Sequence, residues 1–137
     1  VDRESVKSRI AKLMDCVAVL EREVLGRSID EVVASPVLID VLENRARKAI
    51  ECMLDVCKHV VAVKKLGLPE TYRDVIIQLE RNKLIPNELA GRLKDCVGLR
   101  NVIIHRYLEV DYEKLYQVVK RLGKTAKRFI EWTTTLK

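Results

Sequence analysis

The sequence predicts one all-helical domain spanning residues 1–137, and three observations lead to this prediction. The length is that of one ordinary domain, and 48% hydrophobic with 34% charged residues supplies both a core and a hydrated surface. Only five glycines and three prolines interrupt the chain, which favours long helices over many short strands. Apolar residues recur at steps of three and four, which is the period of a helix with one buried face.

The first two helices are expected over residues 3–25 and 35–66. In the first, apolar residues from Val6 to Val24 keep the helical period, and Gly26 stops it. The second begins at Ser35 and Pro36, a capping residue followed by proline at the first helical position. At about thirty residues this helix would be roughly 45 Å long, and a helix of that length usually pairs with another long one.

Three further helices are expected over residues 71–82, 86–107 and 111–133. Thr71 and Asp74 are spaced for a capping arrangement at the start of the short third helix, and Asp111 is placed to cap the last. Because short loops join these segments, neighbouring helices should be antiparallel. The sequence therefore predicts an up-and-down bundle of four main helices plus one short helix.

The net charge of +6 and pI near 9.2 make an anionic partner plausible, with nucleic acid first. The excess is partly local, since residues 111–137 hold seven lysines and arginines against three acidic residues. Two interpretations stay open, a hydrated basic helix and a surface that attracts RNA.

The four cysteines show no C-x-x-C spacing, and each lies in or beside an apolar stripe, so each is expected to be a small core residue. No apolar run approaches the roughly 20 residues of a membrane span, and charged residues interrupt the first twenty positions. We expect a protein of the reducing cytoplasm, with no membrane among its partners.

The helix expected over residues 86–107 carries a charged residue, Arg100, within its apolar stripe. On a helical wheel of 100° per residue, seven apolar positions between Leu89 and Tyr107 fall within about 60° of this arginine. Desolvating an unpaired guanidinium costs several kcal/mol, so Arg100 must be paired or must face a charged group. Pairing with Glu51 or Asp55 of the second segment is one interpretation, and a functional site is the other.

His105 and Asn101 lie one turn apart on the same helix and can share a ligand or a hydrogen bond. Imidazole exchanges protons near pH 7, and arginine binds phosphate through two parallel hydrogen bonds. Together with Arg100 these groups suit phosphodiester cleavage in RNA, in which the 2′-OH attacks the adjacent phosphorus. Because RNA supplies its own nucleophile, we expect neither a metal nor a cofactor.

Arg100 and His105 are five residues apart, which is about 140° around a straight helix, so they do not share a face. Either the helix is distorted near its end, or the two residues act together with copies from a second subunit. The second option predicts a two-fold dimer with a composite cleft.

Residues 98–107, Gly-Leu-Arg-Asn-Val-Ile-Ile-His-Arg-Tyr, resemble the G-L-R-N-x-x-x-H-x-Y segment of HepT-type HEPN proteins, whose hallmark is R-x-x-x-x-H-x-Y. Further similarity covers residues 44–51 with Asp55 and His59, and the connecting segments 68–72 and 84–89. The match therefore extends over most of residues 40–115.

The resemblance implies a HEPN-type antiparallel helical bundle that forms a homodimer. It implies a metal-independent endoribonuclease, the toxin of a type II/VII-like toxin–antitoxin pair, that cleaves tRNA or mRNA; DNA is not expected. Arg100 and His105 map onto the catalytic residues of the family, with Asn101 as a supporting polar group. Tyr107 maps onto the motif tyrosine, to which an MntA-type nucleotidyltransferase antitoxin transfers AMP groups and so silences the toxin.

Glu51, Asp55 and His59 are four residues apart on the second helix, where they either support the site or form a structural, hydrated face. Two alternatives to the ribonuclease also remain, a non-catalytic partner of a nucleotidyltransferase and a plain bundle without a site. The motif argues against the plain bundle, and the effect of a His105 substitution distinguishes the other two.

Overall fold

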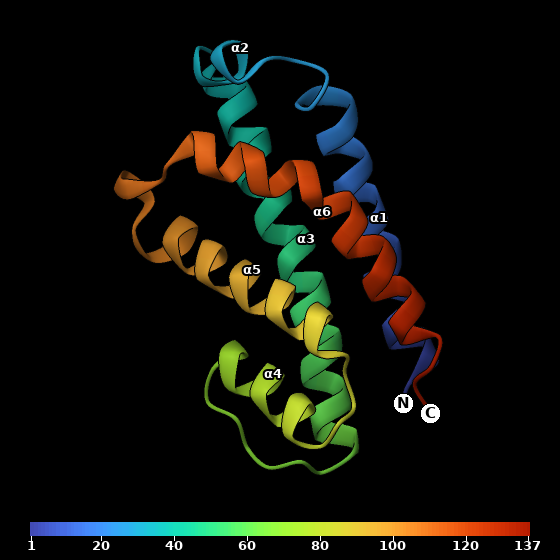
Figure 1. The fold of residues 1–137 in the computed structure, drawn as a ribbon. Coiled ribbons are helices and arrows are strands. Elements are labelled where there is room, and N and C mark those ends of the chain that lie inside the picture. Colours follow the sequence, from blue (N-terminus) through green and yellow to red (C-terminus); the bar gives the residue numbers. More distant parts are fainter.

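The computed structural model describes residues 1–137 and contains helices and no strands. There are six α-helices and one 3-10 turn, η1 (Figure 1). Their bounds are α1 Arg3–Glu23, α2 Ile29–Val33, α3 Pro36–Val63, α4 Tyr72–Arg81, α5 Asn87–His105, η1 Tyr107–Glu109 and α6 Tyr112–Thr133. The predicted all-helical class, with four long helices and a shorter one, is confirmed.

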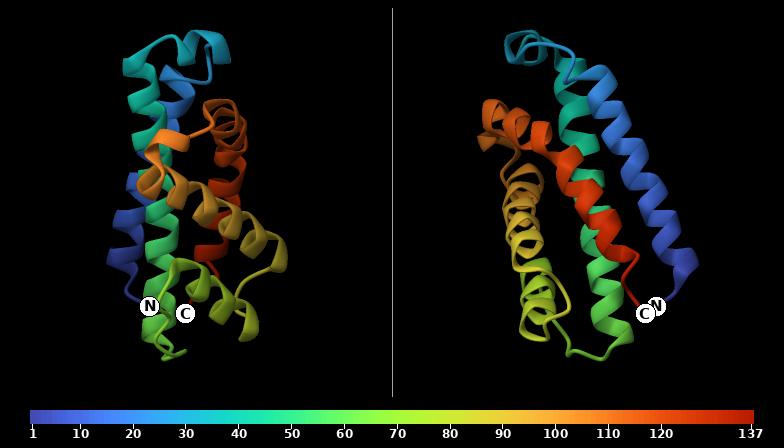
Figure 2. Two further views of the ribbon diagram at one scale, coloured as in Figure 1. Left: turned by 90° about the vertical axis from the view of Figure 1, so that its left-hand side faces the viewer. Right: turned by 45° about the vertical axis from the view of Figure 1, so that its right-hand side comes forward.

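Helix α3 is the centre of the arrangement, because it contacts every other α-helix. It runs beside α1 over most of their lengths, and α6 crosses the two (Figures 1 and 2). Helix α5 packs on α3 and α6, while the short α4 lies between α3 and α5 near the end of the molecule opposite α2. The two chain termini meet, since the amino group of Val1 donates to the carbonyl oxygen of Lys137 at 3.4 Å.

The helix starts follow the capping rules that predicted them. The Ser35 side chain accepts from the backbone N–H of Leu38 at 3.2 Å, with Pro36 at the first helical position. Thr71 caps α4 by accepting from Asp74 at 3.1 Å. Asp111 caps α6 in the same way. Each side chain satisfies a backbone donor that the helix itself leaves without a partner.

Helix α2 was not predicted, although the sequence carries its signal. Ser28 and Glu31 form a reciprocal capping box, in which the Ser28 hydroxyl accepts from the Glu31 backbone at 3.2 Å and the Glu31 carboxylate accepts from the Ser28 backbone at 3.3 Å. Five residues are too few for periodicity to reveal a helix, so the box was the only local sign.

The prediction that α5 continues through Tyr107 is wrong. The helix ends at His105, because Arg106 leaves the helical region with φ −133° and ψ 45°, and the 3-10 turn η1 follows. The chain must reverse direction before Asp111 caps α6, which leaves only five residues for the turn. Tyr107 therefore leaves the apolar stripe of α5, and 65% of its surface is exposed.

A single cluster of 34 buried residues forms the core, with contributions from α1 to α6. Gly123 of α6 marks a close approach to α1, since a Cβ atom there would lie 3.0 Å from the Glu21 carboxylate. All four cysteines are free thiols, and burial raises the pKa of Cys96 to about 12. None of the helices has the length and apolar character needed to cross a membrane.

Candidate active site

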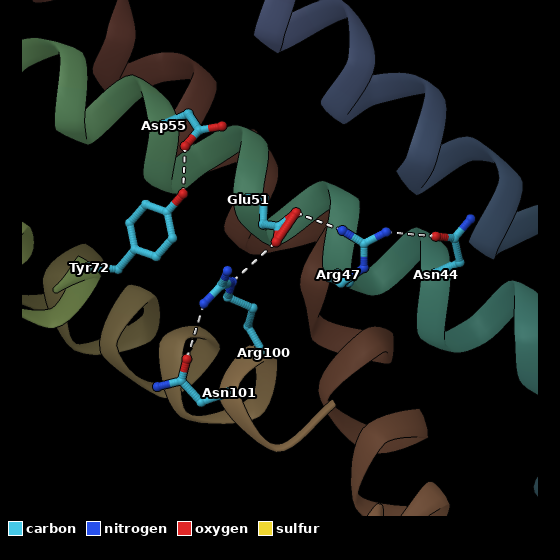
Figure 3. A network of polar contacts seen from close by, with 7 residues as sticks. All are labelled: Asn44, Arg47, Glu51, Asp55, Tyr72, Arg100 and Asn101. Atoms are coloured by element: carbon cyan, nitrogen blue, oxygen red, sulfur yellow. Dashed lines mark hydrogen bonds and ion pairs between the residues drawn. The ribbon is translucent and has the colours of Figure 1, made fainter. Parts of the chain in front are cut away.

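Arg100 lies on the side of α5 that faces α3, with 20% of its side-chain surface exposed. Its Nε donates to Oε2 of Glu51 at 3.1 Å, and its Nη1 donates to Oδ1 of Asn101 at 3.2 Å (Figure 3). Of the two carboxylates named as candidate partners of this arginine, Glu51 is the one that pairs with it. An apolar stripe accepts the cation because α3 supplies the counterion across the helix contact.

Glu51 serves two arginines with its two carboxylate oxygens. While Oε2 accepts from Arg100, Oε1 accepts from Nη1 of Arg47 at 2.7 Å. Arg47 also donates through Nη2 to Oδ1 of Asn44 at 3.0 Å. Asn44, Arg47 and Glu51 are three and four residues apart on α3, so they lie on one face of that helix. Through its ion pair with Arg100, the Glu51 carboxylate links α3 to α5.

Tyr72, the first residue of α4, also contacts Arg100. The centroid of its ring lies 5.0 Å from the guanidinium carbon of Arg100, within the range of a cation–π contact. Its hydroxyl donates to Oδ1 of Asp55 at 2.7 Å, one turn along α3 from Glu51. Burial raises the pKa of Tyr72 to about 12, and the hydrogen bond to Asp55 adds to the shift.

We call the seven residues drawn in Figure 3 the arginine network: Asn44, Arg47, Glu51, Asp55, Tyr72, Arg100 and Asn101. Within it, Nη2 of Arg100 donates to no protein acceptor. Arginine binds phosphate with planar, charge-assisted hydrogen bonds, and Nη2 keeps its N–H groups for such an acceptor. The network thus holds a cation and leaves one of its nitrogens without a protein acceptor.

His105 lies apart from the arginine network. It is the last residue of α5, its side chain is exposed, and it makes no hydrogen bond to Arg100 or Asn101. The helix is regular up to this point, because the backbone N–H of Arg106 still donates to the Val102 carbonyl at 2.9 Å. The helix distortion offered as one way to bring Arg100 and His105 together is therefore absent.

Of the three candidate supporting residues on α3, Glu51 and Asp55 join the arginine network and His59 does not. His59 accepts the backbone N–H of Asp2 through Nε2 at 3.0 Å, beside the start of α1. Each step of four residues rotates about 40° around a helix, so His59 is turned about 80° from Glu51. That rotation carries it away from α5.

Sequence reasoning assigned no role to Arg47 or Tyr72. The spacing of Arg47 and Glu51 by four residues is an ordinary salt-bridge spacing on a helix, and it could have indicated the shared carboxylate. Tyr72 carries no such signal, because its contact with Arg100 depends on how α4 packs. No three His, Cys, Asp or Glu side chains come together in a way that could hold a metal ion.

Comparison with known proteins places the chain in a family. A family model described as "Ribonuclease HepT-like" matches residues 13–132. The chain belongs to the HepT-like ribonuclease family. The resemblance drawn from the residue 98–107 motif is thereby confirmed at the level of the family.

Two relatives and one solved structure illustrate the family. The mRNA nuclease HepT of Shewanella oneidensis is 32% identical over 85 residues, which are 62% of this chain and 64% of that protein. The tRNA nuclease HepT of Aphanizomenon flos-aquae is 23% identical over 92 residues, 67% of this chain and 63% of that one. Each match spans just under two thirds of the relative. The tri-AMPylated Shewanella oneidensis HEPN toxin in complex with MNT antitoxin has a TM-score of 0.88 at 25% identity, covering 96% of this chain and 98% of that one.

From the hydrogen bond between Tyr72 and Asp55 we predict how the pKa of Tyr72 changes when Asp55 is replaced. Replacing Asp55 with alanine removes both the acceptor that favours the neutral phenol and a nearby negative charge, so the pKa of Tyr72 falls from about 12 toward its ordinary value. Phenolate absorbance measured against pH reports the change, and a Tyr72→Phe sample identifies which part of the titration belongs to Tyr72. An unchanged Tyr72 pKa in the folded Asp55→Ala protein contradicts the contact.

Proposed function

We propose that this HepT-like protein is a metal-independent endoribonuclease, the toxin of a toxin–antitoxin pair, with Arg100 and His105 as catalytic residues. The observation that carries the proposal is the held guanidinium of Arg100 with its free Nη2, on the same helix as an exposed imidazole. The names of the Shewanella and Aphanizomenon relatives, an mRNA and a tRNA nuclease, support RNA as the substrate class.

The proposed reaction is an internal transfer within RNA. The 2′-oxygen forms a bond to the adjacent phosphorus while the bond from phosphorus to the 5′-oxygen of the next nucleotide breaks. One proton leaves the 2′-OH and one reaches the departing 5′-oxygen, and His105 moves protons in this exchange. Arg100 stabilises the negative charge that develops on the phosphoryl oxygens. The products are a 2′,3′-cyclic phosphate and a 5′-hydroxyl.

A second copy of the chain completes the site in this proposal. Because α5 is regular up to its end, Arg100 and His105 of one chain stay on different faces. A homodimer in which two α5 helices meet around a two-fold axis brings the Arg100 of one subunit toward the His105 of the other. Exposed apolar side chains near the end of α5 support such an interface, with Tyr107 65% and Leu108 87% exposed.

The basic surface of α6 supports attraction of an RNA backbone. Its six lysines and arginines between Lys114 and Arg128 are all exposed. Two of them, Lys114 and Arg121, line a groove of about 620 Å³ beside α5. Its charged lining also includes Arg73 and Lys94 and three acidic residues, Asp95, Glu109 and Asp111. Basic groups beside a site raise the local concentration of a polyanion and give its binding a strong dependence on salt.

Tyr107 is proposed as the residue that an MntA-like nucleotidyltransferase antitoxin modifies with AMP. Its side chain is exposed on η1, and its hydroxyl makes no hydrogen bond within the chain. The solved toxin similar to this chain is itself tri-AMPylated and bound to its MNT antitoxin. Each AMP group added beside the site brings a negative charge and bulk, both of which oppose RNA binding. The proposal places this pair in the cytoplasm.

A cleavage assay tests the ribonuclease. In EDTA, the unmodified protein should cut total tRNA or an mRNA transcript, and Arg100→Ala or His105→Ala should lower the rate at least about 100-fold, as loss of a charge-stabilising or proton-transferring group does. Arg22→Ala and His59→Ala are matched controls, because each removes the same residue type outside the site and should keep the wild-type rate. Intact RNA in every lane, with Tyr107 unmodified by mass, favours the non-catalytic partner of a nucleotidyltransferase.

A modification assay tests the regulation. With an MntA-like nucleotidyltransferase and ATP, the intact mass should rise by one or more AMP groups and RNA cleavage should fall. Tyr107→Phe should gain no mass and stay active, while Tyr112→Phe should behave as wild type. AMP on any residue other than Tyr107 contradicts the assignment.

A further inference from the structure

An aromatic ring from outside the motif lies beside the guanidinium of Arg100. Tyr72 belongs to α4, which packs on α3 and α5 only. Its ring centroid is 5.0 Å from the guanidinium carbon, and Figure 3 shows the tyrosine on the same side of α5 as Glu51. A cation–π contact of this kind attracts the guanidinium and favours a position of Arg100 beside the ring.

Tyr72 is itself held in place. Its hydroxyl donates to Asp55 at 2.7 Å, which fixes the ring at the end far from the α4 backbone. Helix α3 therefore holds Arg100 twice, directly through Glu51 and indirectly through Asp55 and the Tyr72 ring. The only polar atom of the Tyr72 side chain is hydrogen-bonded to Asp55, so Tyr72 meets Arg100 through its ring.

We infer that Tyr72 is a positioning residue for Arg100, with Asp55 fixing the ring, and this inference rests on the catalytic role proposed for Arg100. Glu51 accepts from Nε, Asn101 accepts from Nη1, and the Tyr72 ring lies beside the guanidinium carbon. Nη2 is the guanidinium nitrogen that keeps no protein acceptor. A guanidinium oriented before the phosphate arrives stabilises the transition state without reorganising, and a misplacement of about 1 Å can cost as much as 100-fold in rate.

Tyr116 of α6 is a matched control, because it makes the same two kinds of contact outside the arginine network. Its hydroxyl donates to the Arg27 carbonyl at 2.5 Å, and the Lys120 ammonium lies 5.2 Å from its ring centroid. Removing it costs a ring, a hydrogen bond and a cation contact, as removing Tyr72 does, and the Tyr116 ring is the more buried of the two. Only Tyr72 touches Arg100.

The first measurement separates rate from binding. Single-turnover cleavage of tRNA in EDTA should be about 10-fold slower for Tyr72→Leu, since the guanidinium loses its orientation. Tyr72→Phe keeps the ring and should recover to within about threefold of wild type. RNA affinity, measured by anisotropy with His105→Ala added to prevent cutting, should change less than about twofold. Tyr116→Leu, compared per folded molecule by circular dichroism, should cleave at the wild-type rate.

The second measurement does not use activity. The Nε–H signal of Arg100 in a nitrogen–proton correlation spectrum, identified by its loss in Arg100→Lys, should carry a ring-current shift and exchange slowly with water. Both properties should disappear in Tyr72→Leu and be unaffected in Tyr116→Leu. Tyr72→Phe keeps the ring but loses its hydrogen bond to Asp55, so its Arg100 signal should keep the ring-current shift and broaden. If Tyr72→Leu does not fold, Asp55→Ala is measured instead, because it keeps the Tyr72 ring but removes the acceptor that fixes it. The Arg100 signal of Asp55→Ala should broaden, and its cleavage rate should fall about threefold.

The outcomes distinguish this inference from the proposed function. Wild-type cleavage by folded Tyr72→Leu, or an unchanged Arg100 signal in that variant, overturns the role of Tyr72. If Arg100→Ala is inactive in the same experiment, the proposed ribonuclease site still stands. Wild-type cleavage by Arg100→Ala instead overturns the proposed site, and the positioning role with it. Equal loss of rate in Tyr72→Leu and Tyr116→Leu assigns the effect to general destabilisation and also overturns the inference.

Discussion

The carboxylate of Glu51 is the contact on which the candidate site depends. Arg100 occupies the middle of an apolar stripe on α5, where a lone guanidinium would be costly to bury, and Glu51 on the central helix α3 removes that cost. The same carboxylate binds Arg47, so two cations share one anion. The side chains are 20–31% exposed, so the pairs are screened less than surface ion pairs and solvated better than core ones. The contact that lets α5 pack on α3 is thus also the one that orients Arg100.

A guanidinium held by its neighbours can bind a substrate phosphate only if some of its N–H groups have no protein acceptor. In the arginine network each restraint takes a different part of the guanidinium, and Nη2 remains open. The group proposed to transfer protons is in the opposite situation, since His105 is exposed and without a partner at the end of α5. In the proposed function, the held guanidinium and the unrestrained imidazole lie on different faces of one regular helix and form two halves of a site that two copies of the chain complete.

The sequence predicted correctly the features that depend on residues close together in the chain. Ser35 with Pro36, Thr71 and Asp111 begin their helices as expected, because capping involves only residues three or four positions apart. The anomaly of Arg100 was visible on a wheel, and Glu51 was one of two expected counterions. The choice between Glu51 and Asp55, the departure of His59, and the contact of Tyr72 could not be read from the chain, because they depend on how α4 and α5 pack on α3. The end of α5 at His105 was missed for a similar reason, since a periodic pattern does not show where the chain must turn.

In the proposed function, Arg100 and His105 act together across two subunits. Co-expression of Arg100→Ala and His105→Ala chains with different affinity tags allows the mixed dimer to be purified and tested on tRNA in EDTA, beside each mutant homodimer. The mixed dimer holds one intact Arg100 and one intact His105 on opposite subunits. It should regain a substantial fraction of wild-type cleavage while both homodimers stay inactive. A mixed dimer as inactive as its parents would contradict the composite site.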